Sequence, residues 1–459
     1  MDIKKVDIEE IVAKQQEYFR TGATRPVAFR KEMLRKLAAA IREYEEAINR
    51  AMMADMNKSP AEVYMTETGI VLEEIRYHLR HLKDWARVRH VPTPLAQFPS
   101  VSFVSPEPYG VALIMSPWNY PIQLCLNPLV GAISAGCTAV IKPSAYAPAT
   151  SAVINEMITS AFPSRYVAVI EGGRQENSAL LNQKFDYIFF TGSPAVGHTV
   201  MEAAAKHLTP VTLELGGKSP VIVDQTANVE VAARRIAFGK VLNAGQTCVE
   251  PDYAFVHKDV RERFIAAYKK AIDQFFPDGD MSDMNVIINE KHYKRVRRLL
   301  VCGDAVVGGG FDDARRFIEP TLLDNVDLSS PIMKEEIFGP ILPMLTYSHL
   351  DTCIEFIQDH PRPLALYLFT RNKAAEKKIL ATCSFGGGCI NDTIVHLATS
   401  QMPFGGVGAS GMGSYHGKKS FDTFTHYRSI LKKANWPDLP VRYRPYTRTK
   451  DRIIRMLLR

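Results

Sequence analysis

Short apolar runs alternate with helical stretches from residue 109 onward, and this alternation limits the possible folds more than any other feature. YGVALIM, TAVIKP, YVAVIEGG and DYIFFTGS each read as a buried strand that breaks at glycine, proline or serine and leads into a helix. A second set begins near residue 213 and includes LALYLFT (364–370) and GGCIN (387–391). Strands of this kind are typical of parallel sheets covered by helices. The sequence therefore predicts an α/β protein with two doubly wound open-sheet domains.

The first 90 residues have a different composition. They are rich in Glu, Lys, Arg, Ala and Leu at helical spacing, so we expect several amphipathic helices. The segment HVPTPLAQFPSVSFVSPEP follows and reads as proline-containing strand, which favours a projecting arm over a core element.

Charge and cysteine content exclude several classes. The formal charge of +7, from 56 basic and 49 acidic residues, is too small for this length to indicate nucleic acid binding. The seven cysteines are widely spread, with no C-x-x-C pair and no zinc-type spacing, which fits a reducing compartment and predicts no metal site. The N-terminus lacks a signal-peptide pattern and no run of 18 apolar residues occurs, so we expect a cytoplasmic protein.

One strand-to-helix turn has the features of a phosphate site. In FDYIFFTGSPAVGHTV a buried strand ends near Gly192 and Ser193, and a helix begins by about Gly197. Backbone N–H groups at a helix N-terminus after a glycine turn bind phosphate. A plain connection between strand and helix is the alternative. The G-x-G-x-x-G match at 406–411 follows no strand, so we interpret it as a glycine-rich loop.

A second strand end carries a lysine. TAVIKPS closes with Lys142, Pro143 and Ser144, where an ammonium group could meet ribose or phosphate oxygens. Taken alone, such a lysine is more often a solvated surface charge. Its interpretation depends on the segments around it.

Six segments occur in an informative order: SPWNYP (116–121), IKPS (141–144), FTGSPAVG (190–197), LELGGKSP (213–220), GQTC (245–248) and EEIFGP (335–340). Together they resemble the aldehyde dehydrogenases. SGMGSYHGKKSFDTFTH near the C-terminus is similar to the class 3 branch, which acts on fatty and aromatic aldehydes. The resemblance extends from about residue 60 to 446 and implies oxidation of an aldehyde to a carboxylic acid with NAD or NADP.

The resemblance implies three catalytic residues. Cys248 matches the nucleophile, whose adduct with the aldehyde can release hydride. Asn119 matches the residue whose side-chain N–H stabilises the oxyanion, together with the backbone N–H of Cys248. Glu214 matches the general base that activates water against the thioester. The alternatives are a buried structural cysteine, a turn asparagine and a salt-bridged glutamate.

The cofactor residues follow from the same motifs. Glu336 matches the carboxylate that holds the nicotinamide ribose, and Phe338 matches the ring beside the nicotinamide. Lys142 and Ser144 match the adenosine-ribose end, and Ser193 matches the pyrophosphate contact.

Position 145 departs from the family pattern. Many members that prefer NAD carry an acidic residue three positions after the lysine, where it accepts hydrogen bonds from the ribose 2′-hydroxyl and repels a 2′-phosphate. This chain has Ala145 instead, which favours use of NADP.

The aldehyde itself is not identified by the sequence. By resemblance, the approach to the thiol is lined by Tyr64, Tyr120, Ile394, Val395 and His396, which fits medium- or long-chain aliphatic or aromatic aldehydes. Two other readings stay open: an acyl-phosphate or acyl-thioester reductase on the same scaffold, and a non-catalytic structural homologue. The presence of Glu214 speaks against the first, and that of Cys248 and Asn119 against the second.

We therefore expect a Rossmann-like nucleotide-binding domain (1–85 and 105–212), a catalytic domain (213–395), and an oligomerisation arm with bridging segments (86–104 and 396–446) that makes a homodimer. Residues 441–459 hold seven basic residues and one acidic residue. If the end of the chain is helical, its apolar residues share one face. Residues 447–459 could then bind a membrane surface peripherally or pack on a partner subunit.

Overall fold

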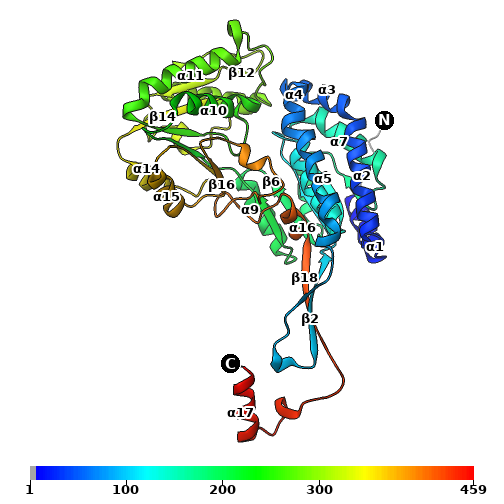
Figure 1. Cartoon of the computed structure of the whole chain (residues 1–459). Helices are drawn as coiled ribbons and strands as arrows, with labels where there is room; N and C mark the ends of the chain where they lie inside the picture. The colour runs from blue at the N-terminus through cyan, green and yellow to red at the C-terminus, as the bar shows by residue number, and fades with distance from the viewer. Residues whose placement is uncertain (1–6, 459) are drawn as a thin grey trace.

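Two parallel sheets lie side by side, as the alternating strands and helices predict, and an antiparallel arm extends away from them (Figure 1). The computed structural model describes residues 7–458, so Arg459 of the predicted tail lies outside the described residues. The predicted fold class is confirmed.

The first sheet has six strands and the strand order of a dinucleotide-binding fold. Its order is β17 (Gly411–Met412), β7 (Val211–Glu214), β6 (Tyr187–Thr191), β3 (Val111–Met115), β4 (Thr138–Lys142) and β5 (Val167–Val169), with only β17 antiparallel. The order of the parallel strands reverses between β3 and β6. Ligands of such sheets bind at this switch point, outside the carboxyl ends of the strands.

Helices cover both faces of this sheet. One face packs with α6 (Gln123–Ala135) and α7 (Pro148–Ala161), and the other with α8 (Arg174–Leu181) and α9 (Pro194–Ala205). Residues along β3 alternate between the two cores: Ala112 and Ile114 join one, and Val111, Leu113 and Met115 join the other. This alternation follows from the two-residue period of a strand.

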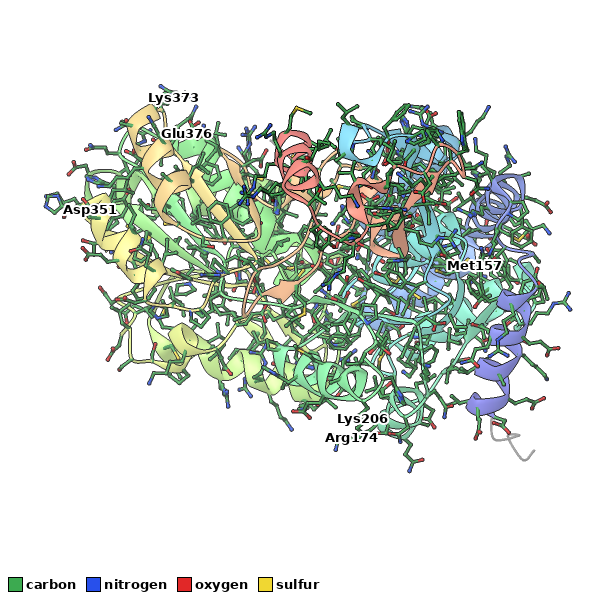
Figure 2. All side chains as sticks on the ribbon, turned by 90° about the horizontal axis from the view of Figure 1, so that it is seen from below. Met157, Arg174, Lys206, Asp351, Lys373 and Glu376 are labelled. Carbon is green, nitrogen blue, oxygen red and sulfur yellow. The ribbon has the colours of Figure 1, made fainter. Side chains whose placement is uncertain are left out.

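The second sheet has seven strands. Its order is β10 (Asp304–Val307), β13 (Thr321–Asp324), β14 (Ile341–Tyr347), β9 (Tyr253–His257), β8 (Pro220–Val223), β15 (Ala365–Phe369) and β16 (Gly387–Ile390), with only β10 antiparallel. Figure 1 shows α10 (Val229–Val241) and α11 (Arg261–Phe275) on one side, and α14 (Leu350–Gln358) and α15 (Lys373–Thr382) on the other. The smaller elements of this domain are β11 (Phe311–Asp312), β12 (Phe317–Ile318), α12 (Glu290–Arg297) and α13 (Pro331–Lys334). The short helix α16 (Lys418–Thr423) contacts α6 of the first domain instead. In Figure 2, Asp351, Lys373 and Glu376 of this domain lie at the opposite end of the molecule from Met157 of the first domain.

The N-terminal helices pack against the first domain. They are α1 (Ile8–Arg20), α2 (Val27–Glu43), α3 (Glu45–Met56), α4 (Pro60–Val63) and α5 (Gly69–Trp85), with a π-helical turn η1 (Tyr64–Thr68) between the last two. On α2, Leu34, Leu37 and Ile41 are fully buried at helical spacing. Contacts of α5 with α6, and of α3 with α7, join these helices to the sheet domain.

The arm is a three-stranded antiparallel sheet of β1 (Arg89–Val91), β2 (Ser100–Pro108) and β18 (Thr425–Lys433). Strand β2 continues past residue 104, where the sequence division placed the limit of the arm. The tail forms α17 (Arg448–Leu457), which contacts the arm tip at η2 (Leu95–Gln97). Among residues 7–458, no helix is long and apolar enough to cross a membrane.

Candidate active site

A cavity of about 260 Å³ lies at the switch point of the first sheet, facing the second domain. Its lining includes the three predicted catalytic residues, Asn119, Glu214 and Cys248, together with the predicted cofactor residues Gly192, Ser193, Glu336 and Phe338. These residues come from the segments after β3 and β6, from the end of β7, and from the loops before β9 and β14. The fold thus brings together side chains that are far apart in the sequence.

The loop before Cys248 has an unusual backbone. Asn243, Ala244 and Gly245 have φ of 52°, 51° and 69°, so three consecutive residues are left-handed. The side chain of Gln246 fixes the loop, because its Nε2 donates to the carbonyls of Asn243 (3.0 Å) and Val286 (3.1 Å). A conformation that costs energy at Ala244 persists only where surrounding contacts hold it, and such strain is frequent at active sites.

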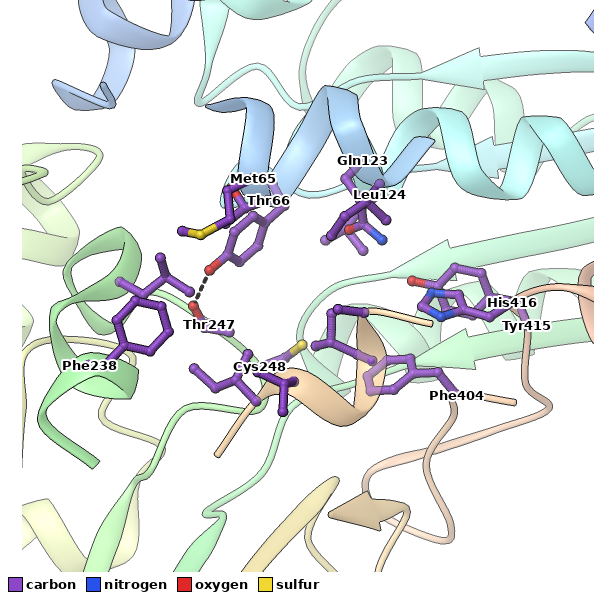
Figure 3. A pocket seen from close by; sticks show the side chains of 17 residues that line it. Met65, Thr66, Gln123, Leu124, Phe238, Thr247, Cys248, Phe404, Tyr415 and His416 are labelled. Atoms are coloured by element: carbon purple, nitrogen blue, oxygen red, sulfur yellow. Dashed lines mark hydrogen bonds between the residues drawn. The ribbon is translucent and has the colours of Figure 1, made fainter. Parts of the chain in front are cut away.

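The Asn119 loop is bonded directly to this cysteine loop. Asn119 Nδ2 donates to the Gln246 carbonyl at 3.0 Å, and Asn243 Nδ2 donates to the Asn119 carbonyl at 2.9 Å. The hydroxyls of Tyr120 and Thr247 make a third link at 2.6 Å (Figure 3). An amide nitrogen carries two hydrogens, so Asn119 keeps one for a ligand in the cavity.

Glu214 ends strand β7 and is buried. Neither of its carboxylate oxygens has a hydrogen-bond partner in the described part of the chain. Burial raises the pKa of the Glu214 carboxyl well above its ordinary value. An unpaired buried carboxyl is costly, so its position on the cavity wall points to a chemical role.

The Cys248 thiol is partly buried at the same wall. Burial raises the pKa of Cys248 above its ordinary value, and the nearby carboxyls of Glu336 and Glu214 raise it further. The thiol is therefore neutral at rest, and attack on a substrate requires a group that accepts its proton.

Glu336 is held by the loop that follows β7. Its Oε1 accepts the backbone N–H of Gly217 at 3.1 Å. Lys218 holds the segment before Glu336 in place, because its Nζ donates to the carbonyls of Ile332 (2.7 Å) and Glu335 (2.9 Å). Burial, then the charge of Asp252, raises the pKa of Glu336 to about 8.

Phe338 lies on the same side of the cavity. It has a φ of 49° and packs edge-on against Trp118, with ring centroids 5.4 Å apart. This places an aromatic wall beside the space between Glu336 and Cys248.

A groove of about 670 Å³ continues from this cavity along the carboxyl ends of β3, β4 and β6. It is lined by Lys142, Ser144 and Ala145 and by Gly192 and Ser193. Lys142 Nζ donates to the Pro143 carbonyl at 2.6 Å, and burial lowers the pKa of Lys142 to about 8.

The groove fits a dinucleotide cofactor. Ser193 precedes the first residue of α9, yet its side chain makes no hydrogen bond to that helix and remains free. The exposed N–H groups of a helix start suit a pyrophosphate. Gly197, in contrast, lies inside α9, where a Cβ would come within 2.8 Å of Leu215, so it serves close packing of the helix on the sheet.

A second, apolar cavity of about 120 Å³ also reaches Cys248 (Figure 3). Tyr120, Ile394 and Val395, three of the five residues predicted for the approach, line it. Its remaining wall is largely apolar and includes Met65, Ile70, Leu124, Phe238, Leu397 and Phe404, with Gln123, Tyr415 and His416 as polar members.

Tyr64 and His396, the other two residues predicted for the approach, are not part of this lining. Tyr64 is 53% exposed, and the π-helical turn that it begins directs Met65 and Thr66 to the cavity instead. His396 packs behind the wall, where its Nδ1 lies 3.6 Å from Cys389 Sγ. Phe238 and Phe404 were missed because they lie on a helix and a loop without a motif of their own.

A dinucleotide groove that leads to a partly buried thiol, an amide donor and an unpaired carboxyl is typical of a nicotinamide-dependent oxidoreductase. The chain belongs to the aldehyde dehydrogenase family, whose model matches residues 1–430. Members of this family use NAD(P), and this chain is accordingly an NAD(P)-dependent enzyme that oxidises aldehydes.

The chain is similar to known proteins over nearly its whole length. The chain is 50% identical over 443 residues to 4,4′-diaponeurosporen-aldehyde dehydrogenase of Staphylococcus aureus, covering 96% of both chains. It is 43% identical to human aldehyde dehydrogenase family 3 member B1, covering 98% of this chain and 96% of the relative. A solved substrate-bound state of Staphylococcus aureus AldH superposes with a TM-score of 0.96 at 48% identity, covering 98% and 99% of the two chains.

Proposed function

We propose that the enzyme oxidises medium- or long-chain aliphatic or aromatic aldehydes to carboxylic acids through a thiohemiacetal and a thioester on Cys248. The observation that carries this proposal is the convergence of Asn119, Glu214 and Cys248 on one cavity wall, between a dinucleotide groove and an apolar cavity.

In the first step, the Cys248 sulfur attacks the aldehyde carbon after losing its proton to a neighbouring base. The free N–H of Asn119 and the backbone N–H of Cys248 donate to the developing oxyanion. A nicotinamide held beside Glu336 and Phe338 would supply the acceptor for the hydride that leaves the tetrahedral adduct. Glu214 then takes a proton from a water molecule that attacks the thioester, and the acid leaves as the thiol re-forms.

The reductase alternative is not favoured. An enzyme that reduces acyl phosphates or thioesters has no use for a base that activates water, yet Glu214 lines the cavity beside Cys248. A non-catalytic homologue is likewise not favoured, because the nucleophile and the oxyanion donor are both retained.

For the cofactor, we propose use of NADP at least comparable with use of NAD. Ala145 removes the carboxylate that would repel a 2′-phosphate, and Lys142 and Arg174 line the same groove. Figure 2 shows Arg174 at the margin of the molecule.

For the substrate, the apolar lining supports an aldehyde with a hydrocarbon or aromatic body. The cavity encloses only the reacting end, and Met65 and Val395 at its wall are about half exposed. The relative named for 4,4′-diaponeurosporen-aldehyde supports long polyene aldehydes as a second candidate class.

A panel of aldehydes of increasing chain length, mixed with enzyme and NAD or NADP, tests this proposal through the absorbance of the reduced cofactor. We expect kcat/KM to rise from short to medium and long chains. Equal values for acetaldehyde and decanal would contradict a role for the apolar cavity, and no reduction of either cofactor would contradict the activity itself.

For assembly, we propose a cytoplasmic homodimer that forms through the arm. The arm exposes several large apolar side chains, including Phe98, Val101, Ile430 and Leu431. Exposed apolar surface of this kind is typical of a protein–protein contact.

For the tail, we propose reversible binding to anionic membranes. On α17, Ile453 and Ile454 share a face, while Arg448, Arg452 and Arg455 are exposed. Cosedimentation with anionic vesicles at low salt should show binding by the full chain and not by a chain ending at residue 446. Equal sedimentation of the two proteins would mean that the tail serves only packing.

A further inference from the structure

Two glutamates of the N-terminal helices, the buried Glu67 and the partly buried Glu62, reach the loops that carry Asn119 and Cys248. Glu67, on the π-helical turn η1, accepts the backbone N–H groups of Ile122 (3.0 Å) and Gln123 (2.9 Å) through Oε2. These donors lie at the start of α6, directly after the Asn119 loop. A carboxylate at this point satisfies N–H groups that a helix start leaves free.

Glu62, on α4, makes the corresponding contact with the cysteine loop. Its Oε1 accepts the backbone N–H of Asn243 at 2.9 Å. Asn243 begins the left-handed run that leads to Cys248. Residues 62–67 therefore bind the backbone of both loops.

A single cation, Lys58, pairs with Glu67 and acts on Glu62 through its charge. Lys58 Nζ lies 2.8 Å from Oε1 of Glu67, and both side chains are fully buried. The same ammonium lies 4.2 Å from the ring centroid of Tyr120, whose hydroxyl bonds Thr247. Burial raises the pKa of Glu62, and the charge of Lys58 opposes this shift. Burying the charges of Lys58 and Glu67 is expensive unless each has a partner, so this pair differs from a surface ion pair.

The π-helical turn makes this geometry possible. Glu62 and Glu67 are five residues apart, which is about one turn where the hydrogen bonds run from residue i to i+5. The bond that closes this turn runs from Gly69 N–H to the Tyr64 carbonyl. A Cβ at Gly69 would lie 2.4 Å from that carbonyl oxygen, so only glycine fits there.

We propose that Lys58, Glu62 and Glu67 are positioning residues that set the placement of the Asn119 amide relative to the Cys248 thiol. They touch neither substrate nor cofactor and act through the two loops. The inference rests on the proposed roles of Asn119 and Cys248. Removing an oxyanion donor typically lowers kcat by about 100- to 1,000-fold, and a misplacement of about 1 Å costs up to about 100-fold.

The test compares Glu67→Gln and Gly69→Ala with a matched control, Arg30→Met. Arg30 is a buried cation that, within residues 7–458, donates only to the carbonyls of Thr24, Arg25 and Ser134. We expect both test variants to lose at least about tenfold in kcat, with the dissociation constant for NADP and the rate of Cys248 alkylation by iodoacetamide unchanged within about twofold. The control should lower the unfolding temperature and leave kcat of the folded enzyme unchanged.

Gly69→Ala separates positioning from stability. Alanine normally stabilises a helix relative to glycine, so an ordinary helix would tolerate this change. If Glu67→Gln does not fold because Lys58 is left unpaired, the Lys58→Met/Glu67→Gln pair restores neutrality and is compared with Lys58→Met/Glu67→Leu, which lacks the acceptor. We expect the Gln pair to be at least about tenfold faster than the Leu pair.

The proposal is overturned if folded Gly69→Ala has a kcat within about threefold of the parent, or if the Gln and Leu pairs are equal. It is also overturned if the losses follow the unfolding temperature in the same way as for Arg30→Met. Failure of the proposed function has a different signature, since Cys248→Ala would then remain active.

Discussion

Replacing Gly216 by alanine should weaken cofactor binding without unfolding the protein. A Cβ at Gly216 would lie 2.2 Å from Oε2 and 2.4 Å from Oε1 of Glu336. These distances are far below van der Waals contact, so the carboxylate must move away by about 1 Å. Because the obstructing atoms end a flexible side chain, the movement costs little stability but breaks the 3.1 Å bond from Gly217 N–H to Glu336.

The expected size follows from the displacement. A shift of about 1 Å in a positioning contact costs up to about 100-fold, or about 2.7 kcal/mol. We therefore expect Gly216→Ala to raise the dissociation constant of the cofactor by roughly 10- to 100-fold. The neighbouring Gly217→Ala is the control, because its Cβ would lie 3.4 Å from the nearest atoms, at Leu364 and Pro363, which is ordinary contact.

Titration of each variant with reduced cofactor, followed by its fluorescence, measures this effect, and thermal unfolding checks the fold. A double-mutant cycle sharpens the test, since in a Glu336→Ala background Gly216→Ala should have no further effect. The reasoning fails if Gly216→Ala binds cofactor as Gly217→Ala does, or if its loss is the same with and without Glu336.

Two further predictions concern the protonation of Glu214 and the recognition of the 2′-phosphate of NADP. Burial raises the pKa of the Glu214 carboxyl, so kcat should rise with pH over a range higher than that in which an exposed glutamate titrates. Glu214→Gln should give one rapid turnover of reduced cofactor followed by slow steady turnover; a Glu214→Gln variant with the parental steady rate would remove Glu214 from the mechanism. Lys142 carries its charge below a pKa of about 8, so the preference for NADP over NAD should fall as the pH rises through 8, and Ala145→Glu should shift preference toward NAD at neutral pH by like-charge repulsion. A parent enzyme with strong selectivity for NAD, unaffected by Ala145→Glu, would contradict that argument.

The fold and the reaction centre were accessible from the sequence because they depend on local patterns. Buried strands that end in small residues define the parallel sheets, and their order places the segments after β3 and β6 at one edge. Cys248, Glu214 and Asn119 each stand in a short motif, and the structure places all three on the wall of one cavity.

The parts that the sequence did not predict depend on contacts between distant segments. Glu67 is separated by 55 residues from the Ile122 N–H that it accepts, and no spacing rule links them. The π-helical turn has no compositional signal, so the direction of Tyr64 could not be predicted, and Met65 and Thr66 were missed as lining residues. The approach residues were transferred by position, whereas side-chain direction depends on local packing, and His396 lies outside the lining of the cavity.

Mass spectrometry of the enzyme after mixing with aldehyde and cofactor tests the central claim most directly. In Glu214→Gln, we expect one acyl group attached to Cys248 for each reduced cofactor formed, since the thioester is made but not hydrolysed. Cys248→Ala should give neither adduct nor reduced cofactor, while its cofactor affinity stays that of the parent. An adduct on another residue, or turnover of Cys248→Ala within about tenfold of the parent, which is about 1.4 kcal/mol of barrier, would contradict the assignment.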